Sequence, residues 1–260
     1  MTDEEIMMLE GIEEKRERWS QYTCNGIKVP RVSAILSATI GKPYLERWAA
    51  NLGSNYDIEK KKILATGTLA HEMIEDFLMI GHIRDQYNIP NSNLLKAMNC
   101  YHNFVIWWNH MKDNGFVIKP LFIEKQLVCP LYGGTCDLIA AITNPYNNNI
   151  TKNYILDFKS SKAISPDYFI QTVLYMKAVD YQRSIGNLEL PEISGVGIIR
   201  VDKEKQNNYE FLLADKGTDF TFLNNISTYA DNMVYWFYQY QSIEYQYKQF
   251  KKNFKNGKDV

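Results

Sequence analysis

The sequence YILDFKSS, residues 154–161, decides how the rest of the chain is interpreted. Its first half is β-branched, aromatic and apolar, and the polar residues Asn153 and Ser160 bound it, which predicts a short buried strand. Side chains alternate along a strand, so Asp157 and Lys159 point to the same side. Burying two charges is costly unless they pair, bind a metal or take part in chemistry. On its own, this stretch fits either an ion pair at a strand end or a reactive site.

Length and composition are those of an ordinary soluble globular protein. The chain has 260 residues, 45% of them hydrophobic and 23% charged, which is enough for one large domain or two small ones with a substantial core. The net charge is −1. A nucleic-acid partner would therefore have to be held by a local basic patch, because the protein as a whole has no positive field.

Cysteine usage and the beginning of the sequence predict an intracellular, cytoplasmic protein with reduced thiols. The four cysteines are scattered and form no CxxC pair, so we expect no zinc ribbon. The first residues are acidic and helix-like, without the features of a signal or transit peptide, and no apolar run is long enough to span a membrane.

Periodicity predicts helices in the first part of the chain and a β-meander after it. Apolar positions recur at helical spacing in the N-terminal third, and from Leu121 they alternate as in strands. The predicted helices are residues 4–21, 33–37, 43–52, 68–80, 93–112, 165–182 and 215–249, the last as one helix or a broken pair. The predicted strands are residues 121–128, 135–142, 154–160, 195–201 and 209–213.

Two carboxylates on successive strands are the strongest chemical feature. Asp137 near the start of one strand and Asp157 on the next are brought together by the hairpin between them. Carboxylate oxygens are hard ligands that suit Mg²⁺ or Mn²⁺. With Lys159 two residues away, able to orient a water and stabilise developing charge, this set suits metal-assisted hydrolysis of phosphodiester bonds.

Four short motifs follow one another along the chain. They are Gly67-x-x-x-His71, Gly134-Thr135-x-Asp137, Asp157-Phe158-Lys159-Ser160-Ser161 and Gln171-x-x-x-Tyr175. In this order they resemble the motifs of the RecB-like nucleases in the PD-(D/E)XK superfamily. The segments 29–36 and 45–48 also resemble the N-terminal region of the exonuclease branch that includes mitochondrial genome maintenance exonuclease and phage relatives, and the match covers roughly residues 29–175.

The resemblance implies a role for each motif. His71, Asp137, Asp157 and the backbone carbonyl of Phe158 would be metal ligands for Mg²⁺ or Mn²⁺, and Lys159 would position the attacking water. The catalytic set would be completed by Gln171 and Tyr175, which would position the DNA backbone or the lysine. An acid often found one strand earlier matches Glu124, which would touch the metal or only its water. Ser160 and Ser161 would contact phosphate or only form a turn.

The resemblance also implies a fold and an activity. The fold would be restriction-endonuclease-like, α/β (α+β), with a central mixed β-sheet flanked by helices. The expected divisions are a helical region over residues 1–65 that forms an arch or lid, a nuclease core over 66–215, and a C-terminal helix with a basic tail over 216–260.

The activity implied is that of a metal-dependent DNA exonuclease in replication, repair or recombination, acting on single-stranded ends or flaps. No cysteine follows Cys136, so the iron–sulfur cluster of some relatives is not expected. Two alternatives stay open: an inactive nucleic-acid-binding module of the same fold, and a structure-selective endonuclease. Protein partners and oligomeric state are not predicted.

Overall fold

A five-stranded sheet forms the centre of the molecule. The computed structural model describes residues 22–41, 43–84 and 91–255. Within them the strand order is β3-β4-β5-β6-β7, and neighbouring strands are antiparallel except β5 and β6, which are parallel. The strands are β3 (Val117–Cys129), β4 (Tyr132–Asn144), β5 (Ile150–Lys159), β6 (Gly195–Val201) and β7 (Tyr209–Asp215). The predicted mixed α/β class is confirmed.

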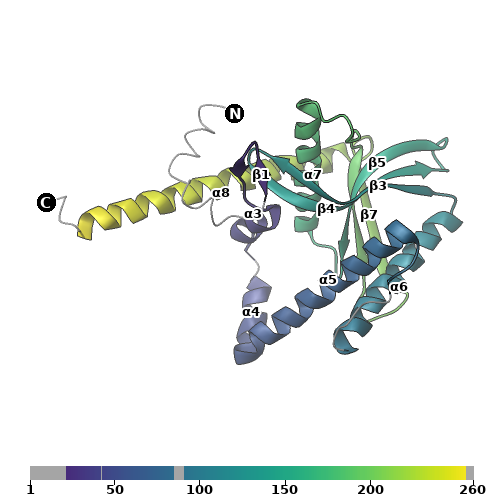
Figure 1. Cartoon of the computed structure of the whole chain (residues 1–260), viewed down its shortest axis with the longest axis horizontal. Coiled ribbons are helices and arrows are strands. Elements are labelled where there is room, and N and C mark those ends of the chain that lie inside the picture. Colours follow the sequence, from purple (N-terminus) through teal and green to yellow (C-terminus); the bar gives the residue numbers. More distant parts are fainter. Residues whose placement is uncertain (1–21, 42, 85–90, 256–260) are drawn as a thin grey trace.

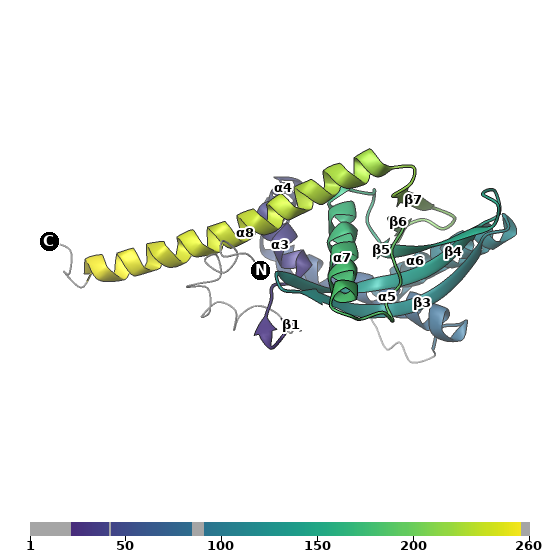
Figure 2. The ribbon, with the colours of Figure 1, turned by 90° about the horizontal axis from the view of Figure 1, so that it is seen from above.

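Helices cover both faces of this sheet (Figures 1 and 2). Leu138 and Leu156 belong to an apolar core shared with α5 and α6 on one face. Ile139 and Ile155 belong to a second core shared with α3, α7 and α8 on the other face. The alternation of side chains along the strands therefore supplies two cores. The covering helices are α3 (Val32–Thr39), α5 (Tyr56–Ile80), α6 (Asn91–Asp113), α7 (Pro166–Ser184) and α8 (Phe220–Lys255).

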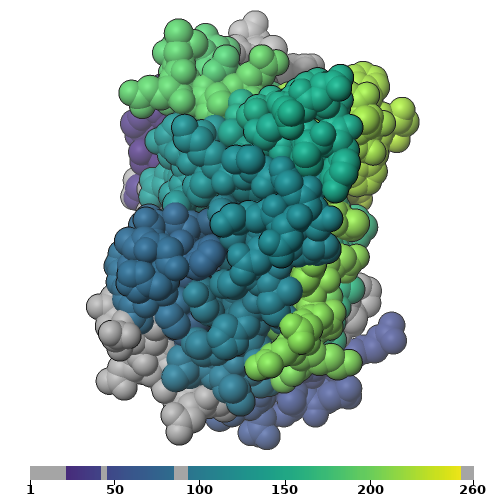
Figure 3. All heavy atoms as spheres, turned by 90° about the vertical axis from the view of Figure 1, so that its right-hand side faces the viewer, coloured from purple at the N-terminus to yellow at the C-terminus, as the bar shows by residue number. Residues whose placement is uncertain are grey.

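Short elements connect these layers. A hairpin of β1 (Thr23–Cys24) and β2 (Ile27–Lys28) precedes α3, and α4 (Pro43–Leu52) with the 3-10 turn η1 (Gly53–Asn55) leads into α5. In the space-filling view from the end opposite the C-terminus, α6 and residues of the strands form a closely packed surface (Figure 3).

The helix α7 makes the crossover between the parallel strands β5 and β6. Parallel neighbours require such a connection, and a helix is its usual form. The predicted start is confirmed: Ser165 is the N-cap and Pro166 occupies the first turn, where its missing N–H costs nothing. The Ser165 hydroxyl donates to the Asp167 carboxylate and makes no capping bond to the backbone. This crossover places the α7 face carrying Gln171 and Tyr175 beside the ends of β4 and β5.

The start of α5 differs from the prediction. We expected Thr66 and Gly67 to open the helix at Thr68, whereas α5 begins at Tyr56 and passes through both residues. The Thr66 hydroxyl donates to the Lys62 carbonyl at 2.9 Å, inside the helix, and a glycine within a helix costs only about 1 kcal/mol. The expected division between residues 65 and 66 therefore lies within one continuous helix. The helix predicted over residues 4–21 lies outside the described residues.

The C-terminal segment is one helix. Of the two expected forms, a single helix or a broken pair, the structure has the single helix α8 of 36 residues. Its first half packs on the body through residues such as Met233 and Phe237, and its second half extends away from it (Figures 1 and 2). No described helix, α8 included, has the length and apolar character needed to cross a membrane.

Candidate active site

The site lies where β4 and β5 separate. The two strands pair in register up to Leu138 and Leu156, and the next residues are Asp137 and Asp157. Both aspartates are buried, with 8% and 1% of their surfaces exposed. The point where the two strands separate is called the fork below. There the Phe158 backbone N–H of β5 donates to the side chain of β4, at Asp137 Oδ2, over 2.7 Å. Asp137 and Asp157 are therefore close together, as predicted, and they lie just beyond the last paired residues of β4 and β5.

Glu124 on β3 joins them because of an irregularity in that strand. Its neighbours Ile123 and Lys125 pair with Leu138 and Cys136, which puts Glu124 beside Asp137. Glu124 has a φ of 47°, in the left-handed region that non-glycine residues seldom adopt and that is enriched at functional sites. On a regular strand, residues four apart lie on the same face. In β3, however, Ile123 packs on the α5–α6 side of the sheet and Leu127 on the α7 side, so the strand turns over at Glu124.

His71 reaches the same point from α5. Its Nδ1 lies 3.6 Å from Asp137 Oδ1, and its ring centroid lies 6.0 Å from that of Phe158. Gly67, one turn earlier, faces the end of β5, because a Cβ there would lie 3.8 Å from Ser160 Oγ. One ligand atom from each of His71, Glu124 and Asp137 lies within 4.8 Å of the other two, so the three form a group that could hold a metal ion.

Asp157 lies outside that group and is held by Lys159. The Lys159 ammonium contacts Asp157 Oδ2, which confirms that the two side chains share one side of β5. Its Nζ also lies 5.2 Å from the centre of the Tyr168 ring, within cation–π range. Tyr168 is a neighbour that the sequence prediction missed, although it lies three residues before Gln171 on the same helix. Lys159 is the partner of Asp157 Oδ2, whereas the buried Oδ1 has no hydrogen-bond partner among the described residues.

Gln171 and Tyr175 lie on one face of α7, as their spacing predicts. The Gln171 side-chain amide donates to the Tyr175 hydroxyl at 3.0 Å. The Tyr175 ring lies against the backbone of Gly134, where an added Cβ would sit 2.5 Å from Tyr175 Cε1. Glycine in the Gly134-Thr135 motif therefore leaves room for the tyrosine. Burial raises the pKa of Tyr175 well above its usual value, and Asp157 adds to that shift, so the hydroxyl stays a proton donor.

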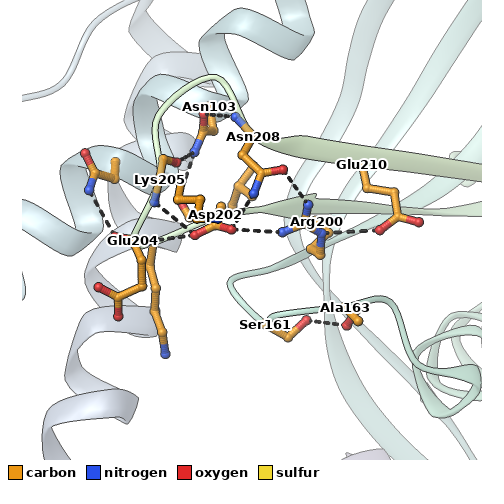
Figure 4. Close-up of polar contacts among 12 residues, drawn as sticks. Asn103, Ser161, Ala163, Arg200, Asp202, Glu204, Lys205, Asn208 and Glu210 are labelled. Atoms are coloured by element: carbon orange, nitrogen blue, oxygen red, sulfur yellow. Dashed lines mark hydrogen bonds and ion pairs between the residues drawn. The ribbon is translucent and has the colours of Figure 1, made fainter.

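Ser161 has a structural partner. Its hydroxyl donates to the Ala163 carbonyl at 2.8 Å in the turn after β5 (Figure 4). Of the two expected roles, this bond fits the one in a turn.

Arg200 lies opposite Lys159 in the β5–β6 register and forms ion pairs of its own. Its Nε lies 3.3 Å from Glu210 and its Nη1 lies 3.5 Å from Asp202. This network fixes the β6–β7 hairpin beside the site (Figure 4).

The charges in the site are coupled. Burial lowers the pKa of His71, but the Asp137 carboxylate outweighs it, so the net pKa is raised. Burial raises the pKa of Asp137, but His71, Lys159 and the Phe158 N–H outweigh it, so the net pKa is lowered. For Asp157, burial dominates and raises the pKa in spite of Lys159. Burial and then Asp137 raise the pKa of Glu124 to about 7.

These residues fit a hard divalent cation. The donors are carboxylate oxygens and one imidazole, the set that suits Mn²⁺ and Mg²⁺. Asp157 Oδ1 is buried without a hydrogen-bond partner, and burial together with the neighbouring Asp137 carboxylate raises the pKa of Glu124. Both features are met by a cation that binds between the acids. Glu124, expected as an optional neighbour of the metal, lies inside the ligand group, whereas Asp157, expected as a ligand, contacts Lys159.

The comparisons with known proteins identify no family. No model of a known protein family matches the chain, and a search of curated proteins finds no match. The nuclease resemblance remains a prediction, and the proposals below depend on the geometry of the site.

Protonation of Glu124 is expected to affect stability in the absence of metal. Its pKa is about 7 in the folded protein against an ordinary value of 4.5, so the folded state retains a proton that the unfolded chain has released. The contribution of Glu124 to the free energy of unfolding should fall as pH rises through this interval. Melting temperatures of the wild type and Glu124→Gln, measured in EDTA across the interval, should diverge as pH rises. Parallel curves would contradict the assignment.

Proposed function

We propose that this protein is a metal-dependent deoxyribonuclease that hydrolyses phosphodiester bonds from single-stranded ends. The observation that carries the proposal is the placement of His71, Glu124 and Asp137, with ligand atoms within 4.8 Å, next to the buried Asp157–Lys159 pair. A strongly perturbed group of acids with an adjacent cation is typical of catalytic sites. Glu124 also has a left-handed backbone inside a strand, and residues in such sparsely populated conformations cluster at active sites.

The side chains divide into ligands and reacting groups. His71, Glu124 and Asp137 would hold the cation, and Asp157 follows the last β4–β5 pair, as Asp137 does. The Phe158 carbonyl would be a further ligand. When bound, the cation would supply Lewis-acid polarisation of the phosphate and a lowered pKa for water. Asp157 fixes the ammonium of Lys159, and this ammonium can orient a water and stabilise charge on the phosphate.

Lys159 and Tyr175 are both in the protonation state that this role needs. Burial lowers the pKa of Lys159, but Asp157 and Asp137 outweigh it, so its pKa is raised and the ammonium stays charged. The Tyr175 hydroxyl, held by Gln171, is available as a neutral donor.

The N-terminal helices support a substrate that enters by its end. The helix that carries His71 begins well outside the body with three exposed lysines, Lys60, Lys61 and Lys62, and α4 adds the exposed Arg47 (Figure 1). The Trp48 and Tyr56 rings lie 5.5 Å apart edge to face at the junction of these helices. Basic side chains next to aromatic rings suit a single strand, whose bases stack and whose phosphates need neutralising.

Metal-dependent cleavage is the direct test. An end-labelled linear single-stranded DNA should be shortened by the protein with Mn²⁺ or Mg²⁺ and left intact with EDTA, because the carboxylate group needs a cation to act on a phosphate. The same labelled strand serves in a binding assay. Retention of the strand without cleavage in either metal would contradict the proposal and favour a binding module.

A further inference from the structure

The half of α8 that leaves the body carries large apolar side chains along one face, called the row below. Each is between 59% and 64% exposed, and they follow one another at alternating spacings of four and three residues. This alternation is that of a seam between two helices. Isolated exposed apolar residues are ordinary, whereas a continuous row on one helix face indicates a partner. The row consists of Trp236, Tyr240, Ile243, Tyr247 and Phe250.

The row continues inward into a groove on the body. Met233 and Tyr229 extend the same alternation toward the start of α8. A cavity of about 440 Å³ lies between the end of α3 and this part of α8, and both side chains line it together with Thr39, Trp236 and Tyr240. The groove and the row are therefore parts of one face of α8.

Two copies of this face complete each other if the helices run antiparallel. With the midpoint of the pair between Tyr240 and Ile243, each Tyr240 lies opposite an Ile243 of the other copy, and each Trp236 lies opposite a Tyr247. The same register puts the Phe250 of each copy at the Met233 of the other, which lines the groove. Each chain therefore supplies both a groove and the side chain that enters it, as a two-fold interface requires.

The charges of α8 favour the antiparallel direction. The helix has no basic residue before Lys248, and two more lysines, Lys251 and Lys252, lie near its end. A parallel pair sets these lysines beside their own copies, where they repel one another. An antiparallel pair lays them along the first half of the other helix, where Asp231 is exposed, and beside the end of α3, whose last turn has no basic residue. A helix C-terminus attracts cations.

The area that the row offers is enough for a stable pair. Aromatic side chains bury about 150–250 Å² each when they are fully covered. At the exposures given above, the row of one copy would bury about 600 Å² and the two rows about 1,200 Å², before the lining of the groove is counted. Stable interfaces between proteins bury roughly 1,200–2,000 Å² in total.

A second copy fits the row better than a single-stranded nucleic acid does. Aromatic rings and lysines together also suit a single strand, whose bases stack and whose phosphates need cations. On α8, however, the lysines all follow Tyr247, and the part from Trp236 to Ile243 has no basic residue within the helix. Phosphates would not be neutralised there, whereas an apolar seam needs no cation.

We propose that two copies of this protein pair through antiparallel α8 helices, row against row. The end of each α8 that carries Phe250 lies in the groove between α3 and α8 of the other copy. This inference does not depend on the proposed function.

Sedimentation equilibrium of the full-length protein tests the pairing. The wild type should have twice the 30.3 kDa mass of one chain at micromolar concentration. Tyr240→Asp should raise the dissociation constant by about a hundredfold or more, because it puts two carboxylates at the centre of an apolar seam. The matched control, Gln249→Asp, adds the same charge at an exposed position of the same half of α8 outside the row, and should leave the constant unchanged.

Three outcomes of this experiment would overturn the proposal. The first is the mass of one chain for the wild type at all concentrations, and the second is equal weakening by Tyr240→Asp and Gln249→Asp. The third is a mass of two chains that appears only with an added single-stranded oligonucleotide, which would favour nucleic acid as the occupant of the row.

Disulfide cross-linking tests the direction. The four native cysteines are buried, so cysteines introduced into the row should react first. Trp236→Cys with Tyr247→Cys should give a covalent dimer on oxidation, because the antiparallel pair puts the two positions opposite each other, whereas within one helix they are about 16 Å apart. Tyr247→Cys alone should remain a single chain on a non-reducing gel. Equal dimer formation by Tyr247→Cys alone would indicate a parallel pair and contradict the proposal.

Discussion

Replacing Lys159 with methionine is expected to reduce DNA cleavage by about a hundredfold to a thousandfold, the usual cost of removing one preorganised charged group from a transition state. Methionine keeps an apolar stem of similar length and loses only the ammonium that contacts Asp157. The folded state should survive, because the pKa of the buried Asp157 is already raised and the carboxyl can take up a proton when its partner is removed. Single-turnover cleavage with saturating Mn²⁺ measures the effect.

Lys152→Met is the matched control. Lys152 lies on the same strand and forms an ion pair with Asp215 at 2.8 Å, at the end of β5 away from the site. Its loss should change stability without changing cleavage. Near-normal turnover by Lys159→Met, with circular dichroism and melting like the wild type, would show that the assigned site is wrong, and Asp157→Ala should give the same loss as Lys159→Met.

A closed circular single strand is expected to survive conditions that fully degrade the linear form of the same sequence. With a net charge of −1 the protein has no general attraction for DNA, so binding depends on a few local contacts. The exposed lysines on α5 and the aromatic pair of Trp48 and Tyr56 supply such contacts on the helices that lead to His71. We expect these helices to cover the site so that a strand enters by its end.

Linear and circular strands of one sequence, incubated at equal enzyme and Mn²⁺ concentrations, separate the two modes of entry. The circle nicked once by an unrelated nuclease is the control, because it should become a substrate when it gains an end. Cutting of the intact circle at the enzyme level that digests the linear strand would contradict end entry. The structure-selective endonuclease would then be the better interpretation, with the same metal site.

The strands, and the antiparallel meander of the first three, were predictable because each strand carries a local signal. The alternation of Leu156, Asp157 and Phe158, and the turn residues before them, predicted both the strand β5 and its antiparallel neighbour β4. The proximity of Asp137 and Asp157 followed from that pairing. The helix face of Gln171 and Tyr175 followed from the four-residue spacing in the same way.

Features that depend on tertiary packing were not predictable. Thr66 and Gly67 are typical of a helix boundary, but the packing of α5 against α6 carries the helix through them. The position of Glu124 depends on a left-handed backbone that no residue type signals, because glutamate rarely adopts it. The sequence therefore does not show that Glu124 belongs to the ligand group. It also does not show that Asp157 contacts Lys159 instead of joining that group.

Titration of Mn²⁺ into the metal-free protein, followed by calorimetry, tests the central claim that the fork between β4 and β5 is a cation site. Asp137→Asn is the informative variant, because it removes the charge next to His71 and keeps an oxygen that can accept the Phe158 N–H. The wild type should bind Mn²⁺ and be stabilised by it in proportion to its affinity, whereas Asp137→Asn should lose both effects. Equal binding of Mn²⁺ by the two proteins would contradict the account.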